Sequence, residues 1–355
     1  MSFSAKEARS LTRLTLPILA TQLAQVGMGT IDTLMSGHVS TEDLAAVAIG
    51  TSVWMPVWLF VSGVLVALSP LASALNAGQR RDELPKLLGA GIYSGILLGI
   101  AAALLLLGAS FVLESFIDDE KTAFVAANYT RAIAAGMPFG GLFLAYRLYA
   151  EALNQPFHVT RIMLFGLAMN VPANGLFIYG WFGLPQLGGI GCGIGSALVF
   201  VGMTIALAFN TRKHRIPKGF PLWQHALHPL KSNVRDIFKI GVPIGVAIFF
   251  EVSLFVVIAL FLTQLGPTVV AGHQVALNLS SLTFMIPLSI AMALTVRVSF
   301  WRGKNEPELA KQTSWLGVKI NLGLAMINAT FMVLFARHIA SLYSPDAEVV
   351  AIAAG

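Results

Sequence analysis

Residues 87–112, LLGAGIYSGILLGIAAALLLLGASFV, form a long apolar run that contains no charged side chain. A membrane-spanning helix needs about 20 consecutive apolar residues, because backbone polar groups in hydrocarbon have to be hydrogen-bonded within their own segment. A membrane β-strand would instead alternate apolar and polar residues over about ten positions, and no such alternation occurs. The stretch therefore predicts a transmembrane helix and an all-α membrane protein.

Similar apolar segments flank this run on both sides. The other segments expected to span the membrane are 14–37, 45–75, 123–149, 159–180, 188–209, 238–263, 269–298 and 314–336. A tenth apolar run begins near Val349. Of the 355 residues, 56% are hydrophobic and 11% are charged, whereas soluble domains carry roughly 25% charged residues. This composition excludes a water-soluble fold.

Basic residues are distributed unevenly between the two sides of the predicted helices. With a cytoplasmic N-terminus, 19 of the 23 Lys and Arg residues fall on cytoplasmic segments, while Glu42 and Asp43 fall on an outer loop. The exceptions are Lys121, Arg131, Lys319 and Arg337. Because loops rich in Lys and Arg stay in the cytoplasm, the pattern predicts a multi-pass protein of the bacterial inner (cell) membrane with its N-terminus inside. The net charge of +6 is explained in this way, without a nucleic-acid partner.

Motifs for catalysis and ATP binding are absent from the sequence. It contains no Walker motif, no cluster of His and Cys, and no Ser with a suggestively placed His and acid. The single cysteine, Cys192, can form no disulfide within the chain, and its glycine-rich surroundings indicate packing. We therefore expect no enzyme, no use of ATP and no cofactor. The polar N-terminus lacks a cleavage site, so no removable signal peptide is expected.

A polar segment divides the predicted helices into two groups. Residues 211–236 contain three prolines and many basic residues, which indicates a cytoplasmic linker. The linker separates an N-terminal lobe, 1–210, with six transmembrane helices from a C-terminal lobe, 237–355, with three transmembrane helices and the start of a fourth. Since the second lobe is incomplete, we expect the chain to be truncated after the ninth helix.

The two lobes are related by a weak internal repeat at an offset of about 225 residues. Pro17 corresponds to Pro243, and Gln25 corresponds to Glu251. An even number of helices in each repeat makes the two repeats parallel. Transporters built from such halves usually enclose a substrate site between them.

Two acidic residues lie far from the ends of their predicted spans. Asp32 is in the first span, within GTIDTLMSG, and Glu251 is in the seventh, within AIFFEVSLF. A charge near the bilayer centre costs about 2.5–3.5 kcal/mol on insertion scales, so such acids usually face a cavity and serve a function. We expect both carboxylates to be buried and to bind a coupling cation, with Glu251 as the metal ligand if that cation is Na⁺. The alternative for Asp32 is a helix end at the membrane surface.

Several amide side chains accompany these acids. Asn170 and Asn174, in LAMNVPANGLF, are four residues apart and therefore share one helix face around Pro172. The two amides are expected either to hydrogen-bond a substrate or proton relay, or to join neighbouring helices. Gln22 and Gln25 on the first helix allow the same two interpretations.

Aromatic and small residues complete the set of candidate positions. Trp54, Trp58 and Phe284 could stack on a cationic or aromatic compound through ring-face attraction, or could simply belong to the core. The spacing of Gly191 and Gly195 in GGIGCGIG lacks the pattern of a nucleotide-binding loop. It indicates instead a close approach between two helices.

Three stretches together resemble one family of transporters. They are PILATQLAQVGMGTIDTLMSGHVS, NVPANGLFIYGWFGLPQLGGIGCGIGSA, and the region from GVPIGVAIFFEVSLF through AGHQVALN. The chain resembles, over its whole length, the bacterial NorM-like branch of the multidrug and toxic compound extrusion (MATE) family. This resemblance implies a MATE-like two-lobe helical bundle, here with a complete six-helix N-lobe and a partial C-lobe. Family members carry a further acid in the tenth helix, which this sequence does not reach.

The resemblance also implies roles for individual residues. Glu251 and Asp32 match the carboxylates that bind the coupling cation in the two lobes. Asn170 and Asn174 match polar residues that accompany Asp32, and Phe284 matches an aromatic residue that lines the cation site of the C-lobe.

The function that the resemblance implies is multidrug efflux, and hence antibiotic resistance. Cationic organic compounds, such as dyes and fluoroquinolone-like drugs, would be exported by antiport with Na⁺ or H⁺ through alternating access. We expect a monomeric secondary transporter in the lipid bilayer. Two alternatives stay open. A lipid-linked oligosaccharide flippase needs a cavity rich in Arg and Lys, of which the spans offer mainly Arg131 and Lys319. The other alternative is a non-transporting membrane scaffold fragment.

Overall fold

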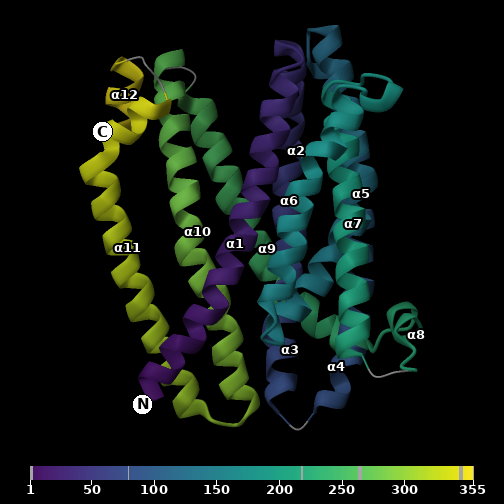
Figure 1. Cartoon of the computed structure of the whole chain (residues 1–355), viewed down its shortest axis with the longest axis vertical. Coiled ribbons are helices and arrows are strands. Elements are labelled where there is room, and N and C mark those ends of the chain that lie inside the picture. The colour runs from purple at the N-terminus through teal and green to yellow at the C-terminus, as the bar shows by residue number, and fades with distance from the viewer. Residues whose placement is uncertain (1–2, 79, 217–218, 263–265, 344–346, 355) are drawn as a thin grey trace. The chain divides into compact units, whose positions relative to one another are not determined.

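A computed structural model describes residues 3–78, 80–216, 219–262, 266–343 and 347–354, and this part of the chain contains helices and no β-strand (Figure 1). The helices are α1 (Phe3–Gly37), α2 (Thr41–Leu65), α3 (Leu68–Ala77), α4 (Leu84–Phe116), α5 (Glu120–Ala152), α6 (Pro156–Ile178), α7 (Gly189–Arg215), α8 (Leu222–Leu227), α9 (Lys231–Leu262), α10 (Pro267–Gly303), α11 (Pro307–Tyr343) and α12 (Ala347–Ala354), with short 3-10 turns at Arg81–Glu83 and Trp181–Gly183. The all-α prediction is therefore confirmed. Lys218, one of the basic residues assigned to the cytoplasm, and residue 263, the end of one predicted span, lie outside the described residues.

Eight helical segments of the described chain are long and apolar enough to cross a membrane. The predicted span 123–149 is not among them, although it forms a helix within α5. α5 carries Arg131 and Arg147, is buried along most of its length, and packs against α2, α3, α4, α6 and α7. A helix enclosed by other helices needs no apolar surface toward lipid. Eight of the nine predicted spans are thus apolar enough to be recognised by composition, whereas α5 is an enclosed helix, and that α5 also crosses the membrane stays a prediction.

A break divides the predicted span 45–75 into α2 and α3. Pro70 has no backbone N–H to donate to the carbonyl group of Val66, and its ring crowds that carbonyl group, so regular helical bonding stops there. The N–H group of Ser69 donates to the carbonyl oxygen of Val66 instead, at 3.0 Å. The span therefore consists of two consecutive helices.

The chain forms two compact units, which we describe separately. One unit comprises residues 1–23 and 250–355, and the other comprises residues 24–249, so that both boundaries fall within helices, α1 and α9. The predicted division into lobes at the linker is a different one and stays a prediction. The linker, 211–236, contains the end of α7, the short helix α8 and the start of α9, and α8 packs against α4.

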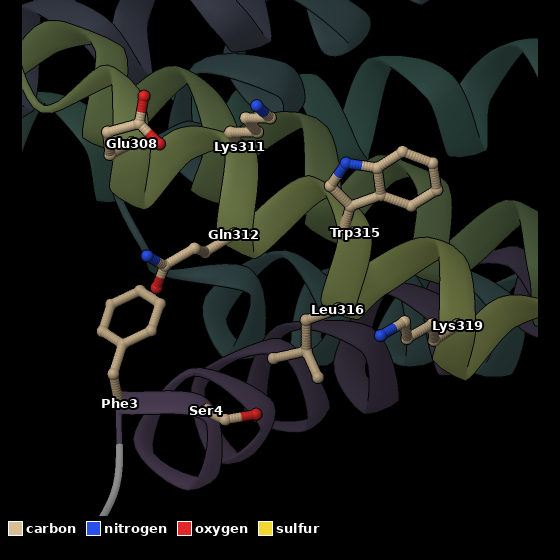
Figure 2. A pocket seen from close by; sticks show the side chains of 8 residues that line it. All are labelled: Phe3, Ser4, Glu308, Lys311, Gln312, Trp315, Leu316 and Lys319. Atoms are coloured by element: carbon tan, nitrogen blue, oxygen red, sulfur yellow. The ribbon is translucent and has the colours of Figure 1, made fainter.

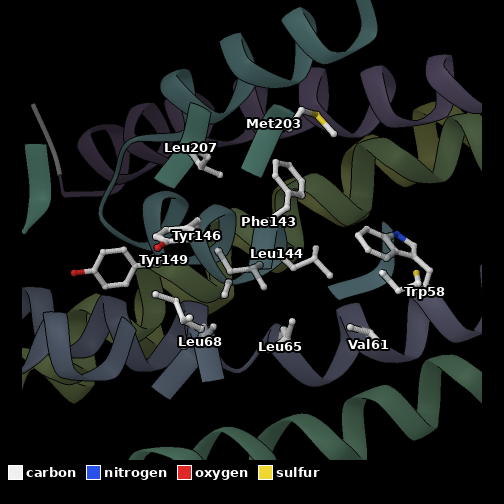
Figure 3. Packing of buried hydrophobic residues seen from close by; sticks show 14 of the residues in the cluster. Trp58, Val61, Leu65, Leu68, Phe143, Leu144, Tyr146, Tyr149, Met203 and Leu207 are labelled. Carbon is white, nitrogen blue, oxygen red and sulfur yellow. The ribbon is translucent and has the colours of Figure 1, made fainter. Parts of the chain in front are cut away.

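The unit of residues 24–249 is built around α5. Figure 3 shows the buried apolar side chains of this unit, among them Trp58 of α2, Phe143 of α5 and Met203 of α7. α4 and α5 come into backbone contact at Gly95 and Gly141, where a Cβ atom on either glycine would collide with the carbonyl oxygen of the other. Small residues at such positions allow membrane helices to pack closely.

The acidic residue Asp43 corrects an expectation drawn from the sequence. It lies in the first turn of α2 rather than on an outer loop, and its side chain is 5% exposed. The hydroxyl group of Ser40 donates to Asp43 Oδ2 at 2.6 Å, and the backbone N–H of Gly189 donates to Asp43 Oδ1. The carboxylate therefore lies in the first turn of α2 and accepts a hydrogen bond from the first residue of α7. At both helix ends, unpaired N–H groups favour a negative charge.

The unit of residues 1–23 and 250–355 contains the first part of α1 together with α10, α11 and α12. Leu11, Leu14 and Ile18 of α1 pack against Ala293 and Val296 of α10. Figure 1 shows α10 beside α11, and α12 packs against both. The apolar core of this unit is small.

Candidate cation and substrate site

Asp32 of α1 is held by three hydrogen bonds from two other helices. The Nδ2 groups of Asn170 and Asn174 on α6 donate to Asp32 Oδ1 at 2.9 and 2.7 Å. The hydroxyl group of Ser196 on α7 donates to Asp32 Oδ2 at 2.8 Å. Asp32 is partly buried, so the prediction that both carboxylates are buried holds for Asp32 only in part. The part of the carboxylate that is removed from water has to be hydrogen-bonded by the protein, and these three donors do so. The predicted association of the two asparagines with an acid is thus present.

The two asparagines reach Asp32 because α6 presents them on one face, one turn apart. Both side chains are almost fully buried, and Asn174 Nδ2 also lies 3.5 Å from Asn170 Oδ1. Asn174 Oδ1 is buried and has no hydrogen-bond partner among the described residues. Buried polar atoms are nearly always paired, so an unpaired oxygen beside a carboxylate is a position where a cation or a water molecule would be stabilised.

Ser196 was not identifiable from the sequence, because it follows a stretch in which glycines dominate. The close helix approach predicted for those glycines is confirmed, since Cβ atoms at Gly191 and Gly195 would collide with α6. This approach brings Ser196 to Asp32. Cys192 lies one turn earlier on the same face, with its Sγ 3.9 Å from the carbonyl oxygen of Asp32, and is buried as its surroundings indicated.

Asp32 lines a cavity of about 100 Å³ within the unit of residues 24–249. Asn170 and Ser196 lie in the same wall. Most of the other lining side chains are aromatic rings or methionines: Met28, Trp54, Met55, Trp58, Tyr129, Phe143, Met163, Phe200 and Met203. Among the lining residues that the structure describes, Asp32 is the only charged one. The cavity therefore combines one carboxylate with an apolar, aromatic wall.

Trp54, a predicted lining residue, is oriented in this wall by Tyr129. Its indole N–H donates to the Tyr129 hydroxyl oxygen at 3.1 Å, and the Thr51 hydroxyl group lies 3.2 Å from the same oxygen. The ring of Trp58 meets Trp54 edge to face, with centroids 6.4 Å apart. Trp58 is only 2% exposed, so it belongs to the core as well as to the wall. Aromatic rings held in this way present faces that attract a cation.

Gln25 also lines the cavity, and its side chain connects α1 to α5. Gln25 Oε1 accepts a hydrogen bond of 3.3 Å from Arg147 Nη1, and Arg147 Nε donates to Glu151 Oε1 at 2.9 Å. Arg147 and Glu151 are 4% and 2% exposed. A buried ion pair needs such additional hydrogen bonds to satisfy its remaining polar atoms. This contact supports the interpretation of Gln25 as a residue that joins helices.

The other predicted site residues lie in the unit of residues 1–23 and 250–355. Glu251 of α9 is exposed, and it forms no hydrogen bond or ion pair with the described residues, so the prediction that it is buried is wrong. The reason is that this part of α9 is not covered by the described chain, since Phe250 and Leu254 are also exposed. Phe284 of α10 is exposed as well. Gln22 is partly buried and is not part of the cavity wall around Asp32.

The donor set around Asp32 limits the chemistry of the site. No group of three or more His, Cys, Asp or Glu side chains that could hold a metal ion occurs in the described part of the chain. The oxygen atoms available are those of one carboxylate, two amides and a hydroxyl group. Oxygen ligands suit hard cations, whereas transition metals are usually bound by imidazole or thiolate groups.

Comparison with known sequences places the chain among bacterial transport proteins. A profile of the MatE family matches residues 17–176 and 243–355. The chain is 39% identical over 353 residues to the probable multidrug resistance protein NorM of Shewanella oneidensis, covering 99% of this chain and 77% of that protein. It is 38% identical over 348 residues to the multidrug resistance protein MdtK of Yersinia pseudotuberculosis, covering 98% of this chain and 76% of that protein.

Solved structures share the fold. The crystal structure of the eukaryotic MATE transporter AtDTX14 matches with a TM-score of 0.85 at 19% identity, over 99% of this chain and 78% of that chain. An outward-facing multidrug resistance MATE family transporter of the MOP superfamily gives a TM-score of 0.82 at 19% identity, over 98% and 77% of the two chains. At such identities the likeness establishes the fold alone, and the predicted MATE-like helical bundle is confirmed. Sequence and fold together show that the chain belongs to the MatE family of membrane transporters.

Proposed function

We propose that this chain exports cationic organic compounds, such as dyes and fluoroquinolone-like drugs, in exchange for Na⁺ or H⁺. The observation that carries this proposal is the pairing of the Asp32 carboxylate with an aromatic and methionine-rich wall that contains no other charge among its described residues. The carboxylate attracts a positive charge, the rings attract a cationic or aromatic body, and methionines adapt to different shapes. The relatives named multidrug resistance proteins support the same substrate class.

Exclusive occupancy of Asp32 would couple the two fluxes. The carboxylate binds either the drug or the coupling cation, and the protein alternates between states open to opposite sides of the membrane. The cavity of about 100 Å³ has room for a small cation with its water, whereas drug-sized ligands occupy pockets of about 300–1,000 Å³, so it has to widen for the drug. One charge that moves inward along the membrane potential contributes about 2.3 kcal/mol per 100 mV, which supports more than a tenfold substrate gradient.

The remaining predicted residues receive supporting roles in this proposal. Asn170 and Asn174 hold the Asp32 carboxylate in the position in which it binds the cation, while Gln22 and Gln25 supply polar groups along α1. Glu251 acts as a second carboxylate for the coupling cation in the proposed lobe 237–355, and Phe284 supplies an aromatic ring to the cation site of that lobe. The protein works as a monomer in the bacterial inner membrane with a cytoplasmic N-terminus.

A lipid-linked oligosaccharide flippase is the less favoured alternative. Its anionic substrate would need Lys or Arg side chains in the cavity around Asp32, and the described residues that line this cavity include neither. A scaffold without transport activity is the third possibility and becomes an outcome of the experiment below.

Asp32→Asn tests the proposal, because it keeps the shape of the side chain and one acceptor oxygen but removes the charge and turns the other oxygen into an N–H donor. We expect ethidium transport in proteoliposomes to fall to background, since neither drug nor cation is then attracted. Imposing sodium and proton gradients separately identifies the coupling ion.

Asp118→Asn is the matched control, because it makes the same chemical change at an exposed residue between α4 and α5. Its transport should equal that of the unmodified chain at equal protein levels. Undiminished flux in Asp32→Asn would contradict the role of Asp32. Absence of flux in the unmodified chain under either gradient would favour the scaffold.

A further inference from the structure

A second cavity, of about 450 Å³, lies within the unit of residues 1–23 and 250–355. Figure 2 shows that its wall comes from the start of α1 and the first half of α11. The lining residues are Phe3 and Ser4 of α1 and Glu308, Lys311, Gln312, Trp315, Leu316 and Lys319 of α11. None of these residues belongs to the proposed transport site.

α11 places Lys311, Trp315 and Lys319 on one stripe, because residues four apart lie one turn above each other. Both lysines are exposed, and neither has an ion-pair or hydrogen-bond partner in the part of the chain that the structure describes. Glu308 is the only acid among the described lining residues. The cavity therefore carries a net positive charge.

The part of the wall that α1 contributes is held in place by a buried ion pair. Glu7 accepts two parallel hydrogen bonds of 2.7 Å from Arg297 of α10, and its side chain is 3% exposed. The indole N–H of Trp301 also donates to Glu7, at 3.2 Å, and the ring of Phe3 packs against Trp301 with centroids 5.7 Å apart. Because Arg297 is neutralised by Glu7, the charge offered to a ligand comes from the lysines of α11.

The position of the stripe suits the surface region of a membrane. Lys319 lies within the candidate span Pro307–Ser341, about 18 Å along the helix from Pro307. A lysine at such a depth extends along apolar surface and keeps its ammonium group near the lipid headgroups, and tryptophan prefers the same region. With the predicted cytoplasmic N-terminus, Lys311 is one of the basic residues expected inside, so this end of α11 lies at the cytoplasmic leaflet, which contains anionic lipids, and Lys319 extends toward that surface from within the span.

We propose that this cavity binds the phosphate headgroup of an acidic phospholipid from the cytoplasmic leaflet. Lys311 and Lys319 pair with the phosphodiester group, and Gln312 donates a hydrogen bond to one of its oxygens. Trp315 and Leu316 contact the glycerol and the first carbons of the acyl chains. Two ammonium groups repel an organic cation, so the transported substrate is excluded from this cavity.

The experiment is a titration of the purified full chain with lipids, read out by native mass spectrometry. Phosphatidylglycerol and phosphatidylcholine with identical acyl chains are compared with glycerol 3-phosphate. We expect phosphatidylglycerol to bind most tightly. Lys311→Gln/Lys319→Gln should weaken that binding about tenfold or more, because each lysine near an anionic lipid contributes about 1 kcal/mol. The affinity for phosphatidylcholine should not change.

Lys231→Gln/Lys239→Gln is the matched control, because it removes two exposed lysines with the same spacing from α9. This variant and the charge-preserving Lys311→Arg/Lys319→Arg should bind phosphatidylglycerol as the unmodified chain does. Equal affinity for the two lipids, or unchanged binding in the glutamine variant, would overturn the proposal. Glycerol 3-phosphate binding as tightly as the lipid would overturn the assignment to a membrane lipid. Since the experiment measures lipid occupancy, its result tests the lipid site independently of the proposed drug export.

Discussion

Asn174 is the residue on which the geometry around Asp32 depends most, because its side chain is fully buried and its amide donates directly to the carboxylate. Asn174→Ala removes a hydrogen bond to a charged group, which is worth about 1.5–3 kcal/mol. We expect kcat/KM for dye transport in proteoliposomes to fall about tenfold or more. Ser196→Ala should cost less, because Ser196 faces the cavity and water can replace its hydroxyl group.

Asn128→Ala provides the control for this comparison. Asn128 is a partly buried residue of α5 that does not line the cavity, and its hydrogen bonds stay within its own helix: its amide donates to the carbonyl oxygen of Phe124, and its Oδ1 accepts from Arg131. Transport should be unaffected in this variant. An equal loss in Asn128→Ala, or no loss in Asn174→Ala, would contradict the assigned role.

The sequence predicted part of this site because some of its signals are local. The four-residue spacing puts Asn170 and Asn174 on one face, and an acid within an apolar run identifies Asp32. Ser196 and Tyr129 could not be predicted, because their importance depends on which helices are neighbours. Local sequence says where a side chain points on its own helix but not what it meets.

The contact between α4 and α5 depends on Gly95 and Gly141, because there is no room for a side chain at either position. Gly95→Ala or Gly141→Ala would place a Cβ atom against a backbone carbonyl group of the facing helix. Overpacking of this kind typically costs about 1–3 kcal/mol, so we expect a clear decrease in the thermal stability of the purified protein.

Gly108→Ala on the same helix, α4, is the control for these substitutions. A Cβ atom at Gly108 would meet nothing within 4 Å. Its unfolding temperature should match that of the unmodified chain. Equal destabilisation by Gly108→Ala and Gly141→Ala would show that glycine itself, rather than the helix contact, is responsible.

The helices themselves were largely predictable from apolar runs, but their details were not. Hydropathy identified eight of the spans, because a helix that faces lipid has to be apolar. α5 is a weaker case, because the neighbours that shield it allow it to be less apolar, and hydropathy could not locate α8, which is only 6 residues long. The break near Pro70 follows from the missing N–H group of proline. It could not be located from hydropathy, because the apolar run continues across it.

For the whole molecule, the central prediction concerns the second carboxylate. Glu251→Gln should reduce ethidium transport in proteoliposomes to background without lowering protein levels, since the proposed mechanism needs a carboxylate in each lobe. Glu306→Gln, at an exposed position directly before α11, should have no effect. Full activity of Glu251→Gln would restrict cation coupling to Asp32.

The exposure of Glu251 shows why burial is harder to predict than membership in a span. An apolar run determines how deep a residue lies along its helix. The side of the helix that is covered depends on the assembly of all the other helices. The unit boundaries within α1 and α9 were unpredictable for the same reason, since the sequence marks loops and not the packing of continuous helices.

The enclosure of α5 has a consequence for how the protein is made. The insertion machinery of the membrane selects segments by their apolar character, and α5 offers it less than its neighbours do. We therefore expect α5 to enter the bilayer together with α4, as the second arm of a helical hairpin closed by the contact of Gly95 with Gly141. Insertion of α5 would then depend on α4, which is translated first and covers the less apolar helix against lipid.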